Sequence, residues 1–321
     1  MKLRIGLGIG PWPFLYENKQ SIITLTEECE RLGIDSLWFS ERVISQVLNF
    51  DPLHLISFIS ARSSNMKFGT SALVLPIRNP VVLAKELATI DYLSGGRLLL
   101  VVGLGSDESS DLQVSGIPRK ERGSRTDEAI TIMRLLWSGN PVTFSGQFYR
   151  FKDASLQPRP IQVQGPPIWI GGRSDPALRR VGRLGDGWLV SSVSLEEVGE
   201  GIHLIQKYAS QYERKIPDDH YGVYLPFCFG DSPSAAEKIA KPNLVRRRTD
   251  LNPNEYCALG TPADVRNRIN DYLTAGATKF VMRPLCSPTL WHDQIRILAQ
   301  EVVRPLQTPY SVSELQDRHG L

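Results

Sequence analysis

The chain is poor in the residues that build metal centres and disulfide frameworks. Its 321 residues include four cysteines and five histidines, and no two cysteines form a CxxC pair. This spacing signals neither a zinc site nor a set of disulfides, so no metal is expected and the thiols are expected to be reduced, as in a cytoplasmic protein. Three histidines fall inside helical patterns, one begins a strand and one lies in the C-terminal tail, so no hydrolase triad is suggested.

An excess of charge of one sign and long apolar runs are also missing. Lysine and arginine number 37 and aspartate and glutamate 34, which leaves a net charge of +3. That balance gives no reason to expect nucleic acid or a membrane surface as a partner. No window approaches the roughly 18 apolar residues of a membrane span. The apolar start of the chain is interrupted by Pro11 and Pro13, so it indicates a first strand rather than a signal peptide.

What the chain has instead is a regular alternation of short apolar runs and longer amphipathic stretches. Asp51-Pro52 and Asn79-Pro80 each open a helical pattern, and Gly95-Gly96 ends the second one. Alternation of strands and helices favours a parallel sheet, and eight such units favour an α/β fold, the closed (β/α)8 TIM barrel, over a doubly wound open sheet. The eight predicted strands are Leu3–Ile9, Ser36–Ser40, Lys67–Leu75, Arg97–Gly105, Ile168–Gly171, Gly187–Val190, His220–Gly230 and Thr278–Pro284.

The predicted domain organisation is a single barrel over residues 1–306, followed by a loose polar tail over 307–321. Insertions are expected at about 104–123, 140–166 and 241–260, and the second of these is suited to a small hairpin. Functional residues of such barrels lie at the C-terminal ends of the strands. The strand ends to examine are Gly8–Gly10, Ser40–Arg42, Ala72–Arg78, Gly103–Glu108, Gly171–Ser174, Val190–Ser192, Phe227–Gly230 and Met282–Pro284.

The stretch "IWIGGRSDPALRR" places two glycines where the fifth strand becomes a helix. Gly171 and Gly172 lack a Cβ, so a ligand can approach the backbone there. Ser174 is suited to cap the helix, whose N-terminus attracts a phosphate, and Arg173 adds a full positive charge. The alternative is an ordinary tight turn with a capped helix, and this stretch alone leaves the two open.

Charged residues follow the second and fourth strands. Arg42 keeps its proton, so it can stabilise a developing anion, whereas Glu41 is the better candidate for moving a proton. After the fourth strand, "VVGLGSDESSD" lacks the third glycine of a dinucleotide fingerprint, which argues against a Rossmann site. Glu108 in this stretch is a third catalytic candidate, and Asp111 is expected to lie in a solvated loop.

Several stretches together are similar to one enzyme family. "GTSALVLPIRNPVVLAKELATIDYLSGGRLLLVVGLG", "ERGSRTDEAITIMRLLWSG", "VTFSGQFY", "PPIWIGG" and "GDGWL" occur in the order found in the bacterial-luciferase-like flavin and deazaflavin oxidoreductases. The resemblance runs from about Leu3 to Pro284. It implies a barrel with insertions, a flavin-type cofactor at its C-terminal mouth, a small organic substrate and a homodimer.

The resemblance also implies roles for particular residues. The cofactor phosphate would lie on Gly172, Arg173 and Ser174, beside Gly171. The cofactor ring would rest on a bulge in the third strand with a non-prolyl cis peptide, a position that matches Ser71 and Ala72. The remaining cofactor-binding candidates are Gly8 at the end of the first strand, and Gly103 and Gly105 at the end of the fourth.

One departure from the family concerns position 42, where many members carry a catalytic histidine and this chain has Arg42. The family divides between enzymes that use the 5-deazaflavin coenzyme F-420 for hydride transfer and FMN monooxygenases that use reduced flavin and dioxygen. The stretches "WFSERV" and "GATKFVMRPL" resemble the F-420 branch more. The alternatives are an FMN monooxygenase, a non-catalytic flavin-binding protein, and a barrel lyase or isomerase that binds a phosphorylated substrate.

Overall fold

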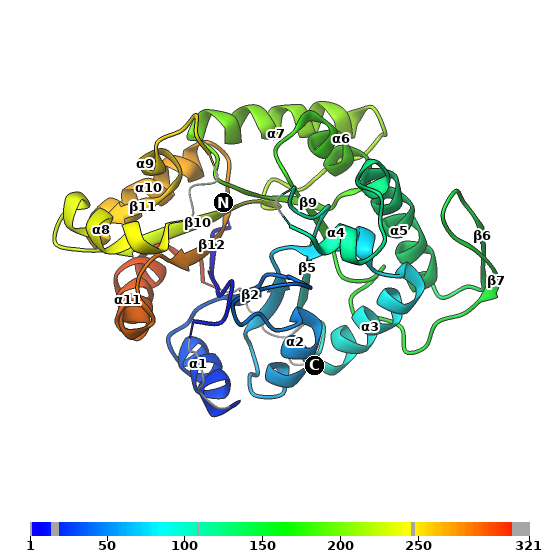
Figure 1. Cartoon of the computed structure of the whole chain (residues 1–321), viewed down its shortest axis with the longest axis horizontal. Helices are drawn as coiled ribbons and strands as arrows, with labels where there is room; N and C mark the ends of the chain where they lie inside the picture. Colours follow the sequence, from blue (N-terminus) through cyan, green and yellow to red (C-terminus); the bar gives the residue numbers. More distant parts are fainter. Residues whose placement is uncertain (1, 14–18, 108, 245–247, 310–321) are drawn as a thin grey trace.

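The predicted strands close into a parallel barrel, which confirms the TIM-barrel prediction (Figure 1). The computed structural model describes residues 2–13, 19–107, 109–244 and 248–309. Around the barrel the order is β1, β2, β3, β5, β8, β9, β10 and β12, and β12 pairs again with β1. These strands are β1 (Arg4–Gly8), β2 (Ser36–Phe39), β3 (Lys67–Thr70), β5 (Leu98–Gly103), β8 (Ile168–Gly171), β9 (Gly187–Ser191), β10 (Tyr221–Phe229) and β12 (Lys279–Pro284).

The longer helices form a ring outside the strands (Figure 1). They are α1 (Lys19–Arg31), α2 (Pro52–Ser60), α3 (Pro80–Leu93), α5 (Arg122–Trp137), α6 (Asp175–Leu184), α7 (Leu195–Ser210), α8 (Pro233–Ala240), α10 (Pro262–Thr274) and α11 (Trp291–Ile297). Two helix starts follow the sequence signals closely. The Asp51 carboxylate accepts from the amides of Leu53 and His54 at 2.9 and 3.1 Å, and Asn79 caps α3 in the same way.

Short helical elements complete the chain between these helices. They are α4 (Asp111–Val114), α9 (Pro253–Tyr256), α12 (Arg304–Leu306), the 3₁₀ turns η1 (Leu75–Ile77), η2 (Arg119–Glu121), η3 (Lys241–Asn243) and η4 (Pro288–Leu290), and the π-helical η5 (Leu298–Val303). Asp111 in α4 is buried, whereas the sequence predicted a solvated position. The reason is tertiary, because its carboxylate accepts hydrogen bonds from the loop that follows β2.

Two of the insertions carry strands. Residues 140–166 hold an antiparallel hairpin of β6 (Val142–Ser145) and β7 (Arg150–Ala154), which projects beyond the helical ring in Figure 1. Residues 241–260 hold β11 (Ala258–Gly260), which no sequence signal predicted. It exists because β10 continues beyond its pairing with β9, and its last three residues pair with β11 instead.

Glycines on the inner face of β1 let large side chains fill the barrel. A Cβ on Gly6 would lie 2.6 Å from the indole nitrogen of Trp38, so only glycine leaves room for that ring. Trp38 packs with Val101, Leu189 and Val281 in a small cluster inside the barrel. Because these side chains occupy the interior of the barrel, a ligand is expected to bind above them, at the C-terminal mouth.

The opposite, N-terminal end of the barrel is closed by paired polar groups. Asp35 accepts a hydrogen bond from Lys279 at 2.6 Å and lies 3.7 Å from the Arg4 guanidinium. Gln307 and Thr308, expected in a loose tail, accept hydrogen bonds from the backbone of the first strand region at 3.0 and 2.9 Å. Residues 310–321 of that tail lie outside the described residues.

Candidate functional site

A cavity of about 760 Å³ opens at the C-terminal mouth of the barrel. Its volume is within the range of small-molecule and cofactor sites. Most of the residues predicted as site residues line this cavity. The predicted residues in its wall are Glu41, Arg42, Ser71, Ala72, Gly103, Gly105, Gly171, Gly172 and Ser174.

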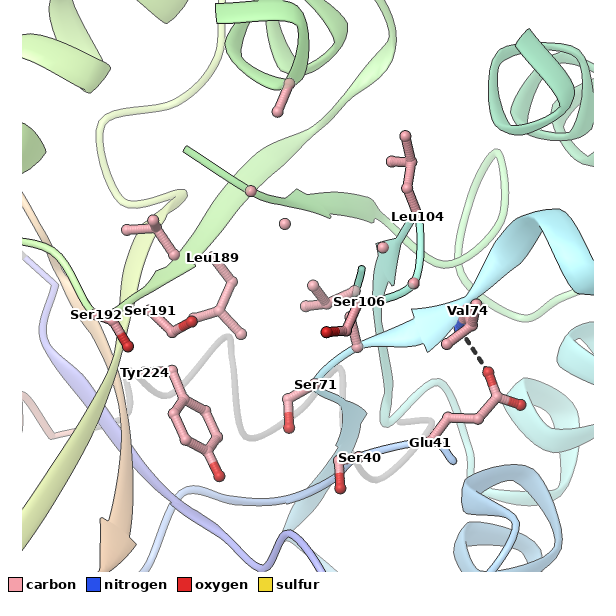
Figure 2. A pocket seen from close by; sticks show the side chains of 18 of the residues that line it. Ser40, Glu41, Ser71, Val74, Leu104, Ser106, Leu189, Ser191, Ser192 and Tyr224 are labelled. Atoms are coloured by element: carbon pink, nitrogen blue, oxygen red, sulfur yellow. Dashed lines mark hydrogen bonds between the residues drawn. The ribbon is translucent and has the colours of Figure 1, made fainter. Parts of the chain in front are cut away.

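The third strand is interrupted where the resemblance predicted a bulge. The Ser71–Ala72 peptide bond is cis, as predicted, and the strand resumes as β4 (Leu73–Val74), which pairs with β5. The Ser71 hydroxyl is buried and has no hydrogen-bond partner. Figure 2 shows this hydroxyl in the middle of the cavity floor. Gly103 lies close beside Ala72, because a Cβ on Gly103 would come within 3.3 Å of the Ala72 Cβ.

Glu41 is buried, and both of its carboxylate oxygens are occupied. One oxygen accepts from the Arg78 guanidinium, with a 2.8 Å contact to Nε, and the other accepts from the Val74 amide at 2.5 Å (Figure 2). Burial raises the pKa of Glu41 above its usual range, although Arg78 and the Val74 amide act in the opposite direction. With its acceptors filled in this way, Glu41 is better suited to hold the bulge than to exchange a proton with a ligand.

Arg42 reaches the cavity from the loop after β2, with 35% of its side chain exposed. Its guanidinium lies 4.0 Å from Asp111, whose other oxygen accepts from the Val43 and Ile44 amides at 3.2 and 3.0 Å. Asp111 therefore joins the insertion after β5 to the loop that carries Arg42. Glu108, the third catalytic candidate, lies outside the described residues.

The start of α6 forms the opposite wall of the cavity. Gly172 has a φ of +109°, which favours glycine, and Ser174 occupies the N-cap without a side-chain capping bond. Ser174, Pro176 and Ala177 line the cavity, so the N-terminus of α6 borders it, and the Ser174 side chain makes no capping bond. Arg173 is exposed and does not line the cavity, contrary to the expectation of direct contact with the phosphate. Arg180, one helical turn into α6, lines it instead.

Basic side chains also border this wall. Arg119, Lys120 and Arg122, from the insertion after β5, line the cavity close to α6. Arg119 and Arg122 both pair with Asp107, whose pKa they hold below its usual range. Arg180 is buried and pairs with Asp127 of α5. The wall at α6 is thus rich in positive charge and hydrogen-bond donors.

Gly8, predicted as a cofactor-binding residue, is not among the residues that line the cavity. A Cβ on Gly8 would lie 2.9 Å from the ring of Tyr224 and 3.1 Å from its hydroxyl oxygen. The absence of a side chain at Gly8 therefore makes room for the ring of Tyr224, which lines the cavity (Figure 2). Gly10 has the same relation to Arg283, with a Cβ 3.3 Å from the guanidinium carbon.

The sequence did not single out Tyr224, Arg180 or the basic residues after β5. Tyr224 precedes the expected strand end because β10 continues past the barrel mouth to meet β11. Arg283 and Ser192 fall within the strand ends named from the sequence, but no motif distinguished them from their neighbours. The Gly-x-Gly-x-Gly spacing of the first strand is the one signal that pointed to large side chains from other strands.

The described residues show neither a metal-ligand cluster nor a membrane-spanning helix. Across residues 2–13, 19–107, 109–244 and 248–309, no three histidine, cysteine or acidic side chains are grouped as metal ligands. Within the same residues, no helix has the length and apolar character needed to cross a bilayer. The four cysteines are free and buried.

Comparison with known proteins places the chain in a family. Residues 4–279 match the family model of luciferase-like monooxygenases, so the chain belongs to this family, as the sequence resemblance predicted. An F420-dependent glucose-6-phosphate dehydrogenase from Nocardia farcinica is 37% identical over 274 residues, which cover 75% of this chain and 78% of the relative.

Solved structures share the fold. The monooxygenase RslO1 from Streptomyces bottropensis superposes with a TM-score of 0.82 at 19% identity, covering 94% of this chain and 99% of the other. The coenzyme F420-dependent tetrahydromethanopterin reductase from Methanopyrus kandleri gives a TM-score of 0.79 at 18% identity, covering 96% and 100%. At these identities the likeness shows the barrel fold alone.

Proposed function

We propose that the protein is an oxidoreductase that binds coenzyme F-420 at the barrel mouth and transfers hydride to or from a small organic substrate. The observation that supports this most is the arrangement of two features in one cavity. The uncapped start of α6 suits a phosphate, and the Ser71–Ala72 bulge, with Gly103 packed beside it, suits a flat ring. The residues present therefore fit a flavin-type cofactor.

Within this proposal the phosphate is held by Gly172, Ser174 and the N-terminus of α6, with Arg180 adding charge. The ring rests on Ser71 and Ala72. When bound, the deazaflavin supplies a carbon that accepts or donates hydride. Arg42 stabilises negative charge on the reduced ring or on a substrate oxygen, and Tyr224 and Arg283 lie on the side of the cavity that remains for the substrate.

The basic residues Arg119, Lys120 and Arg122 favour coenzyme F-420 over FMN. The deazaflavin coenzyme carries an acidic tail beyond its phosphate, whereas FMN ends at the phosphate. Arg119 and Arg122 share one acidic partner, Asp107, so with Lys120 this part of the cavity wall carries a net positive charge that matches the longer anion. The F420-dependent relative from Nocardia farcinica supports the same choice. An FMN-dependent monooxygenase is the second candidate, because the family model and the fold of RslO1 agree with it equally well.

Titration of the purified protein with coenzyme F-420 and with FMN, each oxidised and reduced, tests the proposal. Micromolar binding of F-420 with much weaker binding of FMN is the expected result. Preference for reduced FMN, with oxygen consumption, would favour the second candidate. Binding of neither would overturn the proposed function.

Homodimer formation and a cytoplasmic location are further parts of the proposal. They follow from family membership and from four free, buried thiols, which suit a reducing compartment. Light scattering of the purified protein measures the mass, and a monomer at micromolar concentration would contradict the dimer.

A further inference from the structure

Arg78 lies at the end of the η1 turn, which follows β4 and so comes shortly after the Ser71–Ala72 bulge in the chain. Its guanidinium donates to Glu41, with a 2.8 Å contact from Nε, and to Asp51 at 2.6 Å. A third carboxylate, that of Glu86, lies 3.9 Å away. Arg78, with 18% of its side chain exposed, is the centre of an ionic network in which Glu41 is buried and Asp51 and Glu86 are partly exposed.

This network reaches the bulge through one hydrogen bond. The oxygen of Glu41 that does not bind Arg78 accepts from the Val74 amide, two residues after Ala72 (Figure 2). β4 is only two residues long, and its ladder consists of Leu73 opposite Val102 and Val74 opposite Gly103. A strand this short depends on additional contacts for its position, and the Glu41 carboxylate supplies one at its centre.

Arg78 itself does not line the main cavity. It faces a second cavity of about 500 Å³, and Glu41 belongs to the walls of both cavities. Arg42 and Asn49 also line both cavities. Of the three shared residues, Glu41 is the one that accepts hydrogen bonds from Arg78, so it provides the route by which Arg78 can act on a ligand in the main cavity. The residues around the second cavity are Glu41, Arg42, Val43, Asn49, Asp51, Ile77, Arg78 and Ser115.

We infer that Arg78 is a positioning residue for the cofactor ring, acting through Glu41 and the Val74 amide on the Ser71–Ala72 bulge. The inference rests on the proposed function, because it assumes that the bulge supports a ring. Removing the guanidinium leaves a buried carboxylate without its counter-charge, so Glu41 must take up a proton or turn toward solvent. Either change weakens the contact to Val74 and frees β4 to move.

Four variants test the inference. Arg78→Met removes the charge and the hydrogen bonds, Arg78→Lys keeps the charge, and Glu41→Gln neutralises the intermediary. Arg134→Met is the matched control, because Arg134 of α5 also forms a half-buried ion pair, with Asp186 at 2.7 Å, and lies outside the cavity wall. Each variant is titrated with coenzyme F-420 and with FMN, and its backbone hydrogen exchange is measured without cofactor.

The expected result is a selective loss at the bulge. In Arg78→Met the amides of Leu73 and Val74 exchange at least tenfold faster and cofactor binds about tenfold more weakly, with partial recovery in Arg78→Lys. Adding Arg78→Met to Glu41→Gln weakens binding less than twofold further, because both act along one chain of contacts. Arg134→Met leaves the affinity and the exchange at the bulge unchanged.

The outcomes separate this inference from the proposed function. Faster exchange with cofactor affinity within twofold of the wild type would show a purely structural clamp and overturn the inference. Equal weakening by Arg134→Met would trace the loss to general destabilisation and overturn it too. Wild-type protein that binds neither cofactor would overturn the proposed function, and the inference would fall with it.

Discussion

Buried charged groups at the two ends of the barrel differ in how fully they are paired. At the N-terminal end, the enclosed Asp35 has two counter-charges, Lys279 at 2.6 Å and Arg4 at 3.7 Å. At the C-terminal end, Asp111 is almost as buried, yet one of its oxygens has no hydrogen-bond partner and lies 4.0 Å from Arg42. Arg283 has no acidic partner among the described residues, and its Nε is buried without an acceptor.

This difference suggests that the N-terminal end of the barrel contributes mainly to the stability of the fold, whereas the C-terminal end is suited to bind a ligand. Buried polar groups that are paired within the protein contribute to the fold, whereas buried groups without partners are costly unless something else satisfies them. Three such atoms border the main cavity, in Ser71, Asp111 and Arg283. The mouth of the barrel is therefore the end where a ligand can supply missing hydrogen bonds.

The largest effect is expected from Asp35→Asn at the N-terminal end. Loss of the carboxylate leaves Lys279 and Arg4 buried without their counter-charge, which costs about 3–5 kcal/mol of unfolding free energy. Denaturant titration measures this, and cofactor affinity of the folded fraction is expected to stay within twofold. A large loss of affinity with unchanged stability would break the proposed separation of the two ends.

The next largest effect is expected from Ser174→Asp at the mouth of the barrel, which should change cofactor affinity and leave stability almost unchanged. Aspartate is as good an N-cap as serine, so stability is expected to stay within about 0.5 kcal/mol. Its charge lies where the phosphate is proposed, so cofactor affinity should fall about 30-fold, or about 2 kcal/mol. Ser194→Asp at the N-cap of α7, outside the cavity wall, is the control. Equal cofactor affinities of Ser174→Asp and Ser194→Asp would contradict the proposal that the phosphate binds at the start of α6.

A smaller and redox-dependent effect is expected from Arg42→Met. The reduced deazaflavin ring carries negative charge, so its affinity should fall about tenfold, or about 1.4 kcal/mol, while the oxidised form changes less than twofold. The partial exposure of Arg42 limits the size of the effect. Arg125→Met, outside the cavity wall, is the control, and equal loss for both redox forms would show that Arg42 does not sense ring charge.

The smallest effect concerns pH and the N-terminal end. Burial acts to raise the pKa of Glu30, but hydrogen bonds from the Asn65 amide, the Ser63 hydroxyl and neighbouring amides hold it below its usual range. A carboxyl whose folded pKa is depressed stabilises the fold above its unfolded pKa and loses that contribution as pH falls through the folded pKa. The difference in Tm between wild type and Glu30→Gln should therefore shrink as pH drops below about 4.3. A constant difference would contradict this.

Much of the fold could be predicted from local signals. Short stretches of sequence predicted the helix caps at Asp51 and Asn79 and the eight strands of the barrel, and the structure confirms them. The strand β11 could not be predicted, because its three residues form a strand only beside the overlong β10. The burial of Asp111 has the same cause, since its partners are amides 67 and 68 residues away in the chain.

The candidate site divides in the same way. Its glycines and the start of α6 could be predicted from local motifs, because the shape of a turn depends on neighbouring residues. The cis bond at Ser71–Ala72 was implied by the family resemblance alone. The exposure of Arg173, the occupied acceptors of Glu41 and the place of Tyr224 over Gly8 could not. Each of these depends on which strand lies beside which, and at what register.

By itself, then, the sequence determined the barrel, its closed order of strands and the family to which the chain belongs. Periodicity, caps and glycines act over a few residues, so they can be recognised in the chain alone. Only the tertiary structure decided which charges are paired and which face the cavity. Pairing is a matter of a few ångströms between residues far apart in sequence, and that distance is set when the barrel closes.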